Sequence, residues 1–293
     1  KHESTLLKKE VLFEQYLKIV GFNSEPVLLT YPDNKELEEI LETAMQSRPE
    51  YEFTTTYKDT HYLWNIDNKS VISRVESIFS EMNKLYIADG HHRSASSSLL
   101  ALDLEKENPN HTGKEAYNYF MSYLIPESDL KIYEFNRLIR DLNGLSKEEF
   151  LISIDQYYRI ENRGCVYYKP TKKHHFSMYL DGEYYSLYLR KEEYTIENSL
   201  DSLDVQILYG TILKPILGIQ DLRNNDRIEY PHGNSDLAYL KSKIDSGEFV
   251  VGFNLLPVTI QELKNVANEG LTMPPKSTFI EPKLRRGITI YEF

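Results

Sequence analysis

One stretch of the sequence, LYIADGHHRSASSSLLAL at residues 85–102, constrains the fold more than any other. Its first four residues are mostly apolar and run directly into Asp89-Gly90. Small residues and leucines at helical spacing follow Arg93. A short apolar run that ends at a turn signal is typical of a buried strand, and apolar residues that recur every three or four positions are typical of a helix. We therefore predict a strand that turns through glycine directly into a helix.

The first third of the chain alternates between helix and strand patterns. Asn34 stands where a helix cap is expected, because its short side chain can accept hydrogen bonds from the first backbone N–H groups. Lys58-Asp59 separates two β-rich runs and is a turn signal. The predicted helices are residues 5–20, 35–46 and 68–82, and the predicted strands are residues 26–31, 51–57, 61–66 and 85–88. This alternation predicts α/β layering.

The middle of the chain is rich in aromatic and β-branched residues. Asp181-Gly182 separates HHFSMYL from EYYSLYL and predicts a hairpin. Many of the 23 tyrosines lie in this part, where packing within a sheet is favoured over a base-stacking platform. The last third predicts a helix at 203–213, a strand at 249–256 and a helix at 259–270, whose Gly270 suits a helix end.

These patterns together predict a mixed α/β fold in three segments. Residues 1–140 form an α/β part that contains the Asp89 turn, residues 141–200 form a segment rich in β-hairpins, and residues 201–293 form a C-terminal α/β lobe. The sequence has no internal repeat or low-complexity linker, so we expect one compact unit. The chain opens at Lys1 without a methionine, as a processed or trimmed product would.

The bulk composition is that of an ordinary globular protein with an acidic surface. Its 34 basic and 45 acidic residues give a net charge of -11, which repels nucleic acid unless basic residues gather in one place. No apolar run approaches the roughly 20 residues that span a bilayer. The single cysteine, Cys165, excludes an internal disulfide and favours a reducing, cytoplasmic location, and we expect its thiol to be packed.

The residues that follow Asp89 have the composition of an anion site. The first N–H groups of a helix lack partners and carry the positive end of its dipole, and Gly90 permits close approach of a ligand to the backbone. Arg93 adds a planar fork that fits phosphate oxygens, and His91 and His92 add donors that titrate near neutral pH. Asp89 could bind Mg²⁺ or accept a proton from a hydroxyl nucleophile. The alternative is purely structural: an Asp89 cap, a glycine that relieves strain, and capping or surface histidines.

A second group of residues, MPPKSTFIEPKLRRG at 273–287, concentrates positive charge near the C-terminus of an acidic chain. Its prolines stiffen the loop and restrict helix formation. Lys276 and Lys283 supply ammonium groups, and Ser277 and Thr278 supply hydroxyls, so the loop suits a polyphosphate. We predict that it packs beside the Asp89 turn and that Lys276 or Lys283 faces the same cleft. The alternative is a solvated C-terminal loop.

Four lesser candidates are better explained by structural roles. They are His2-Glu3, His61, Asn136-Arg137 and His232-Gly233.

At these motifs the chain resembles a known family. IADGHHR with its small-residue helix is the strongest mark, and MPPKSTFIEPKLRRG is the second. Shorter matches are His61-Tyr62-Leu63-Trp64, Asn136-Arg137, LDVQIL at 203–208 and LGIQD at 217–221. Together they resemble the bacterial uncharacterised family called domain of unknown function 1015 (DUF1015). Members of that family usually carry a further N-terminal segment, so the resemblance implies one before Lys1.

That family is itself similar to the free serine kinases and, more distantly, to the ParB and sulfiredoxin fold. The resemblance implies a ParB/sulfiredoxin-like core in which Asp89, Gly90, His92 and Arg93 match a nucleotide-phosphate turn and His91 fills its variable position. It implies an ADP- or ATP-dependent phosphotransferase with Mg²⁺ that acts on a small hydroxyl substrate such as serine. Glu3 is the one candidate for the second acidic group that those kinases carry upstream of the turn.

The motif residues and the basic C-terminal loop together suggest a role for each candidate residue. Arg93, Lys276 and the helix N–H groups would hold the phosphates, with Gly90, His91, Ser277, Thr278 and Lys283 beside them. Asp89 would be a metal ligand or general base, and His92 a phosphate contact or proton carrier. Two rival functions stay open: a nucleotide sensor or scaffold that binds phosphate without turnover, and a ParB-like nucleic-acid module, which the net charge of -11 disfavours. A nucleotide or another phosphate-bearing small molecule is the expected partner, and the sequence does not predict the oligomeric state.

Overall fold

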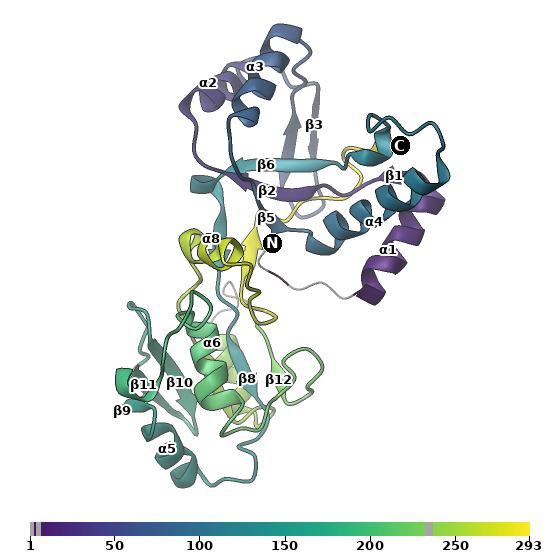
Figure 1. Cartoon of the computed structure of the whole chain (residues 1–293). Helices are drawn as coiled ribbons and strands as arrows, with labels where there is room; N and C mark the ends of the chain where they lie inside the picture. The colour runs from purple at the N-terminus through teal and green to yellow at the C-terminus, as the bar shows by residue number, and fades with distance from the viewer. Residues whose placement is uncertain (1–2, 4–6, 232–236) are drawn as a thin grey trace.

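Figure 1 shows the computed structural model of the chain, which describes residue 3 and residues 7–231 and 237–293. Within these residues the α-helices are α1 (Leu7–Val20), α2 (Lys35–Met45), α3 (Lys69–Ser80), α4 (His91–Glu107), α5 (Lys147–Asp155), α6 (Asp204–Leu208), α7 (Leu237–Asp245) and α8 (Ile260–Asn268). The short helices are η1 (Ala116–Asn118), η2 (Glu127–Asp129), η3 (Lys191–Glu193) and the π-helix η4 (Tyr209–Leu213). The predicted mixture of α and β structure is confirmed.

The strands gather in two main sheets and three strand pairs. They are β1 (Phe22–Asn23), β2 (Val27–Tyr31), β3 (Tyr51–Thr54), β4 (Thr60–Leu63), β5 (Tyr86–Asp89), β6 (Ser122–Pro126), β7 (Lys131–Tyr133), β8 (Arg137–Ile139), β9 (Tyr158–Gly164), β10 (His175–Leu180), β11 (Glu183–Leu189), β12 (Ile228–Glu229), β13 (Val251–Asn254), β14 (Phe279–Glu281) and β15 (Tyr291–Glu292).

The N-terminal part of the chain is built on a three-stranded sheet in the order β5-β2-β6. The central strand β2 runs antiparallel to β5 and parallel to β6. Its register places Leu28 opposite Asp89, so β2 fixes the position at which the Asp89 turn leaves the sheet. Helices α1 and α4 pack against each other at one side of this sheet, and α2 and α3 lie together on another side (Figure 1).

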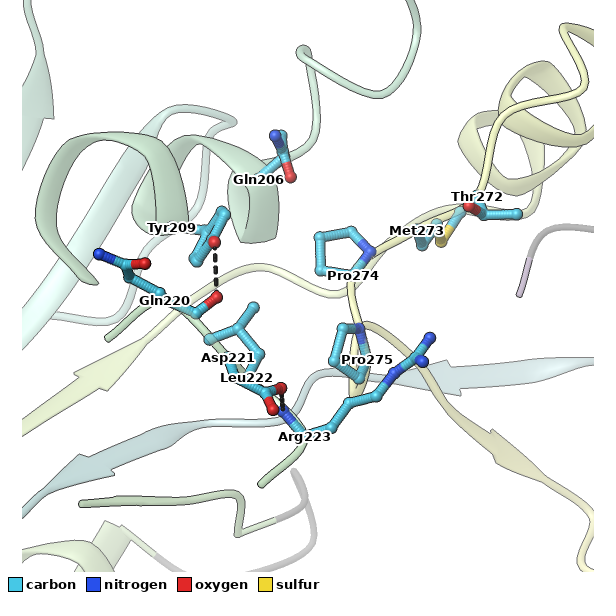
Figure 2. A pocket seen from close by; sticks show the side chains of 10 residues that line it. All are labelled: Gln206, Tyr209, Gln220, Asp221, Leu222, Arg223, Thr272, Met273, Pro274 and Pro275. Carbon is cyan, nitrogen blue, oxygen red and sulfur yellow. Dashed lines mark hydrogen bonds between the residues drawn. The ribbon is translucent and has the colours of Figure 1, made fainter. Parts of the chain in front are cut away.

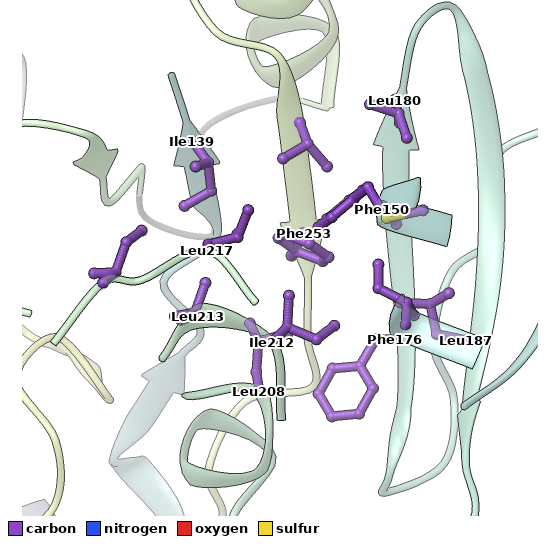
Figure 3. Packing of buried hydrophobic residues seen from close by; sticks show 14 of the residues in the cluster. Ile139, Phe150, Phe176, Leu180, Leu187, Leu208, Ile212, Leu213, Leu217 and Phe253 are labelled. Carbon is purple, nitrogen blue, oxygen red and sulfur yellow. The ribbon is translucent and has the colours of Figure 1, made fainter. Parts of the chain in front are cut away.

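The second sheet has six antiparallel strands in the order β12-β8-β13-β10-β11-β9. Helices α5 and α6 and the π-helix cover one face, where Phe150, Ile212 and Phe253 belong to one buried cluster (Figure 3). Helix α7 covers the opposite face, where Leu240 and Tyr179 belong to another. Adjacent strand residues point to opposite faces, and helices cover both faces, so side chains on both faces of this sheet are buried.

The C-terminal residues join the two sheets. Strand β14 pairs with β7, β15 pairs with β1, and Glu3 forms an isolated parallel bridge with Met273. A shared apolar cluster contains Leu28 and Ala88 from the first sheet and Leu263 and Ile280 from the C-terminal segment. Strands of residues 201–293 therefore pair with strands of both earlier segments, and the predicted division at 140 and 200 stays a prediction.

Several local predictions are confirmed because their signals are local. Asn34 caps α2 by accepting from the backbone N–H of Leu37 at 3.0 Å. Asp181 and Gly182 have φ angles of 49° and 81°, the left-handed geometry of a two-residue hairpin turn between β10 and β11. Tyrosines of the middle segment pack in the sheet as expected, among them the buried Tyr158 and Tyr185.

Helix α4 begins at His91, directly after Gly90 as predicted, although the helical spacing of small residues and leucines starts three residues later, after Arg93. Cys165 is exposed in the turn after β9, so the expected packed thiol was wrong. In the described part of the chain, we find no helix with the combined length and apolar character that crossing a bilayer requires.

Candidate functional site

The Asp89 turn is shaped by Gly90 and covered by Arg93. Gly90 precedes α4 with a φ of 96°, a left-handed conformation that glycine adopts without strain. A Cβ atom on Gly90 would lie 3.0 Å from the Arg93 guanidinium carbon. The Arg93 side chain therefore folds back over the turn, and glycine is the residue that leaves room for it.

Arg93 is held in this position by local partners. Its Nη2 donates to Asp89 Oδ2 at 2.8 Å, and its Nη1 lies 3.1 Å from Glu25 Oε1 and donates to the carbonyl oxygen of Pro26. The side chain is only 20% exposed. A phosphate contact by Arg93 would therefore require an exchange of these partners.

The structure brings the Asp89 turn and the MPPKST loop together, as predicted. A cavity of about 510 Å³, here called the larger cavity, lies between them. Lys283 Nζ is 3.5 Å from Asp89 Oδ1, and Lys276 also lines the cavity. Two segments nearly two hundred residues apart in sequence thus share one site. The lining residues are Glu3, Asp89, Phe135, Tyr230, Met273, Pro274, Pro275, Lys276, Ser277, Thr278, Phe279 and Lys283.

The loop has a fixed shape that presents its lysines to the cavity. Lys276 has a φ of 58°, and the buried Ser277 donates its hydroxyl to the Pro274 carbonyl at 2.7 Å. The Lys276 ammonium lies 5.2 Å from the centre of the Phe135 ring, and the Lys283 ammonium lies 5.1 Å from that of Phe279. Aromatic faces attract cations, so these rings hold both ammonium groups at the cavity wall.

Arg137 holds the backbone of the loop at Lys276 in place, a role that the sequence pattern did not reveal. Its guanidinium is 1% exposed and donates to the carbonyl oxygens of Phe135 and of Lys276, the latter at 3.1 Å. It also lies 5.2 Å from the centre of the Tyr230 ring. Burial lowers the pKa of Arg137 to about 10, so the group keeps its charge at neutral pH. The one sequence feature that could have indicated this role is an arginine within an apolar strand pattern, and from the sequence we interpreted it only as structural.

Glu3 is an acid of the larger cavity with a raised pKa. Desolvation raises the pKa of Glu3 first, and the negative charge of Asp89 raises it further. The positive charges of Lys276, Arg223 and Lys283 act in the opposite direction. Raised pKa values at a cleft are typical of functional carboxyl groups. The sequence offered Glu3 only as a loose match, because nothing local predicts that it reaches the turn.

The remaining predicted residues lie outside the cavity lining. Gly90, His92 and Arg93 surround the turn behind Asp89 without lining the cavity. His91 is buried, and its Nδ1 lies 3.4 Å from Glu3 Oε2, so it contacts the site through Glu3. His61 stacks on Phe53, with 5.0 Å between the ring centres, in the hairpin of β3 and β4. His2 and His232-Gly233 fall outside the described residues.

A second cavity of about 350 Å³, here called the smaller cavity, adjoins the first. Met273, Pro274 and Pro275 line both cavities, so they form the wall between them. Figure 2 shows Pro274 and Pro275 on one side of the smaller cavity and Tyr209 on the other. The lining residues are Gln206, Tyr209, Gln220, Asp221, Leu222, Arg223, Thr272, Met273, Pro274 and Pro275.

The surroundings of Asp89 do not fit a resident Mg²⁺ ion. One Asp89 oxygen pairs with Arg93 and the other faces Lys283. Mg²⁺ prefers six oxygen ligands in octahedral geometry, often with substrate phosphates among them. Across the described residues, we find no group of three His, Cys, Asp or Glu side chains that could hold a metal. In this structure Asp89 is an ion-pair partner, and its predicted role as a metal ligand lacks supporting groups.

Comparison with known proteins places the chain in a family. Residues 1–206 match the family described as "Protein of unknown function (DUF1015)". The match covers well over half of the 293 residues, and the chain belongs to this family. No curated protein matches it.

Solved structures show a distant likeness over nearly the whole chain. A free serine kinase in complex with AMP is 14% identical with a TM-score of 0.40, over 96% of this chain and 82% of that one. SbnI with C-terminal truncation from Staphylococcus aureus is 12% identical with a TM-score of 0.46, over 97% and 79%. A conserved hypothetical protein from Pyrococcus furiosus is 12% identical with a TM-score of 0.37, over 96% and 85%.

Proposed function

We propose that this protein is a nucleotide-dependent phosphotransferase that acts on a small hydroxyl-bearing substrate. The observation that carries the proposal is the meeting of Glu3, Asp89, Lys276 and Lys283 around one cavity. Phosphoryl transfer requires mainly positioning and neutralisation of charge, together with a group that accepts the acceptor's proton. The larger cavity offers both kinds of group.

The two lysines would bind the phosphates of the nucleotide. Lys276 lies in a loop whose shape is fixed by Ser277 and Arg137, and Lys283 follows strand β14, so little conformational freedom is lost when an anion binds. The cavity of about 510 Å³ is within the size range of small-molecule sites. Its mixed walls of lysine, proline and aromatic residues suit a ligand with both a charged and an apolar part.

Glu3 is the better candidate for the general base. Both carboxylate oxygens of Asp89 already have cationic partners, Oδ2 with Arg93 and Oδ1 with Lys283. Glu3 has a raised pKa, and a general base works best when its pKa approaches the working pH. In the reaction, the acceptor oxygen would form a bond to the terminal phosphorus, the bond from that phosphorus to the nucleotide oxygen would break, and the hydroxyl proton would pass to Glu3. Asp89 would orient Lys283 and Arg93.

Glu3→Gln tests this assignment, with Glu42→Gln, an exposed carboxylate of α2 outside both cavities, as the matched control. Binding of ADP, ATP and pyrophosphate is measured by isothermal titration, and transfer to serine, threonine and small alcohols is followed by phosphorus NMR. We expect Glu3→Gln to bind at least as tightly as the unmodified protein and to lose transfer by about 10²- to 10⁴-fold, the usual contribution of a general base. Glu42→Gln should change neither.

Two other outcomes would change the conclusion. Tight binding by the unmodified protein without transfer to any acceptor would favour a nucleotide sensor. Absence of binding by any of the three phosphate ligands would remove the proposal altogether.

A further inference from the structure

Among the described residues, Arg223 is the arginine that lines a cavity and whose guanidinium makes no hydrogen bond, ion pair or ring contact. Within the described residues, every other arginine guanidinium except that of Arg48 makes a hydrogen bond, an ion pair or a ring contact. In a chain with 45 acidic and 34 basic residues, an unpaired arginine is therefore the exception. Arg48 lies outside both cavities, whereas Arg223 lines the smaller one.

The nearest acid in the sequence does not hold the Arg223 guanidinium. Asp221 Oδ1 accepts from the backbone N–H of Arg223 at 2.8 Å, and its Oδ2 accepts from Asn224 Nδ2 at 3.1 Å. These bonds close a turn between α6 and β12 and lower the pKa of Asp221. Asp221 thus shapes the backbone, and the Arg223 side chain is left to extend along Pro275, with its guanidinium beyond the proline ring (Figure 2).

The position of Arg223 links the two cavities. Pro275 belongs to the wall that they share. The charge of Arg223 also reaches the larger cavity, because it lowers the pKa of Glu3 alongside Lys276 and Lys283. Three cations from two parts of the chain therefore act on the space around Glu3. Two of them line the larger cavity, and the third approaches it from the smaller one.

We propose that Arg223 is a further anion-binding residue of this site, and that the ligand extends as a chain of phosphates from the larger cavity toward the smaller one. Lys276 and Lys283 contact one end of the chain, and the planar guanidinium of Arg223 contacts the phosphate that reaches the shared wall. A single phosphate or a pyrophosphate occupies the lysines without reaching Arg223. The ligand class is therefore a triphosphate chain, either inorganic or part of a nucleoside triphosphate. This inference rests on phosphate binding in the larger cavity, the first part of the proposed function.

A series of ligands of increasing length tests the proposal. Binding of phosphate, pyrophosphate, tripolyphosphate and ATP is measured by isothermal titration at constant ionic strength for the unmodified protein, Arg223→Met and Arg48→Met. We expect Arg223→Met to weaken tripolyphosphate and ATP by about 10-fold or more, as for a lost charged hydrogen bond, and pyrophosphate by less than about 2-fold. Arg48→Met, which removes the other unpaired guanidinium, should match the unmodified protein for all four ligands.

The dependence of the affinity loss on the length of the phosphate chain distinguishes a direct contact with Arg223 from a long-range effect of its charge. Equal losses for all four ligands would show that Arg223 contributes only long-range charge and would overturn the proposal, as would no loss for any. Failure of the unmodified protein to bind even pyrophosphate would instead refute the phosphate site itself. ATP binding tighter than tripolyphosphate would identify a nucleotide as the source of the chain, and weaker or equal binding would identify the inorganic chain.

Discussion

Replacement of Lys283 with methionine removes one ammonium group from the larger cavity and keeps most of the length of the side chain. The aliphatic stem can still pack on Phe279, so the change addresses charge more than shape. What is lost is the contact with a bound anion and the 3.5 Å pairing with Asp89 Oδ1. Asp89 keeps its bond to Arg93 at 2.8 Å, so no carboxylate is left without a partner.

The expected magnitude follows from exposure. A hydrogen bond to a charged group contributes about 1.5–3 kcal/mol, and solvent reduces this for a partly exposed pair. Because the Lys283 side chain is 50% exposed, we expect a loss of about 1–2 kcal/mol in binding, or roughly 5- to 30-fold in Kd. Pairs as exposed as Lys283 and Asp89 contribute about 0–1 kcal/mol to stability, so the free energy of unfolding should change by less than about 1 kcal/mol.

Isothermal titration with pyrophosphate and urea denaturation measure the two quantities. Lys214→Met, an exposed lysine outside both cavities, is the matched control and should leave both unchanged. An unchanged affinity in Lys283→Met would refute the reasoning. A loss of the same size in Lys214→Met would show that the net charge of the protein, and not a contact in the cavity, sets the affinity.

Two further predictions concern Glu3 and Arg137. Burial and the charge of Asp89 raise the pKa of Glu3 above the ordinary 4.5, so the Glu3 carboxylate should stop repelling an anion as the pH falls through that raised value. The affinity advantage of Glu3→Gln for pyrophosphate should therefore be largest near pH 8 and vanish in acid. An advantage that does not change with pH in the titrations would contradict this. Arg137→Met leaves two carbonyl oxygens without their donor, so the free energy of unfolding measured in urea should fall by about 1–3 kcal/mol. The control is Arg140→Met, which also loses hydrogen bonds to two carbonyl oxygens but at an exposed position, and its free energy of unfolding should fall by less. Greater stability of Arg137→Met would show that the cost of burying its charge exceeds the value of its hydrogen bonds.

The parts of the fold that the sequence predicted are those with local causes. The Asn34 cap and the Asp181-Gly182 turn each depend on a few neighbouring residues, and both were found where expected. The start of α4 at His91 was predicted from the Asp89-Gly90 turn, because the helical spacing of small residues and leucines appears only after Arg93. The pairing of β14 with β7 has no local signal, since it depends on contacts across more than a hundred residues.

The site was predicted in part for the same reason. Asp89, Lys276 and Lys283 carry recognisable composition, and the structure places all three at one cavity. The sequence could not show that Arg93 would form ion pairs with both Asp89 and Glu25, because Glu25 precedes a different strand and reaches Arg93 only after folding.

Arg223 was missed entirely. Its position beside Pro275, at the edge of the smaller cavity, follows from folding and has no local signal in the sequence.

The most direct test of the central claim is a crystal structure of the protein soaked with pyrophosphate. The account predicts density for the anion in the larger cavity, with oxygens within hydrogen-bond distance of Lys276 Nζ and Lys283 Nζ. An empty larger cavity in crystals that bind pyrophosphate elsewhere on the molecule would contradict it.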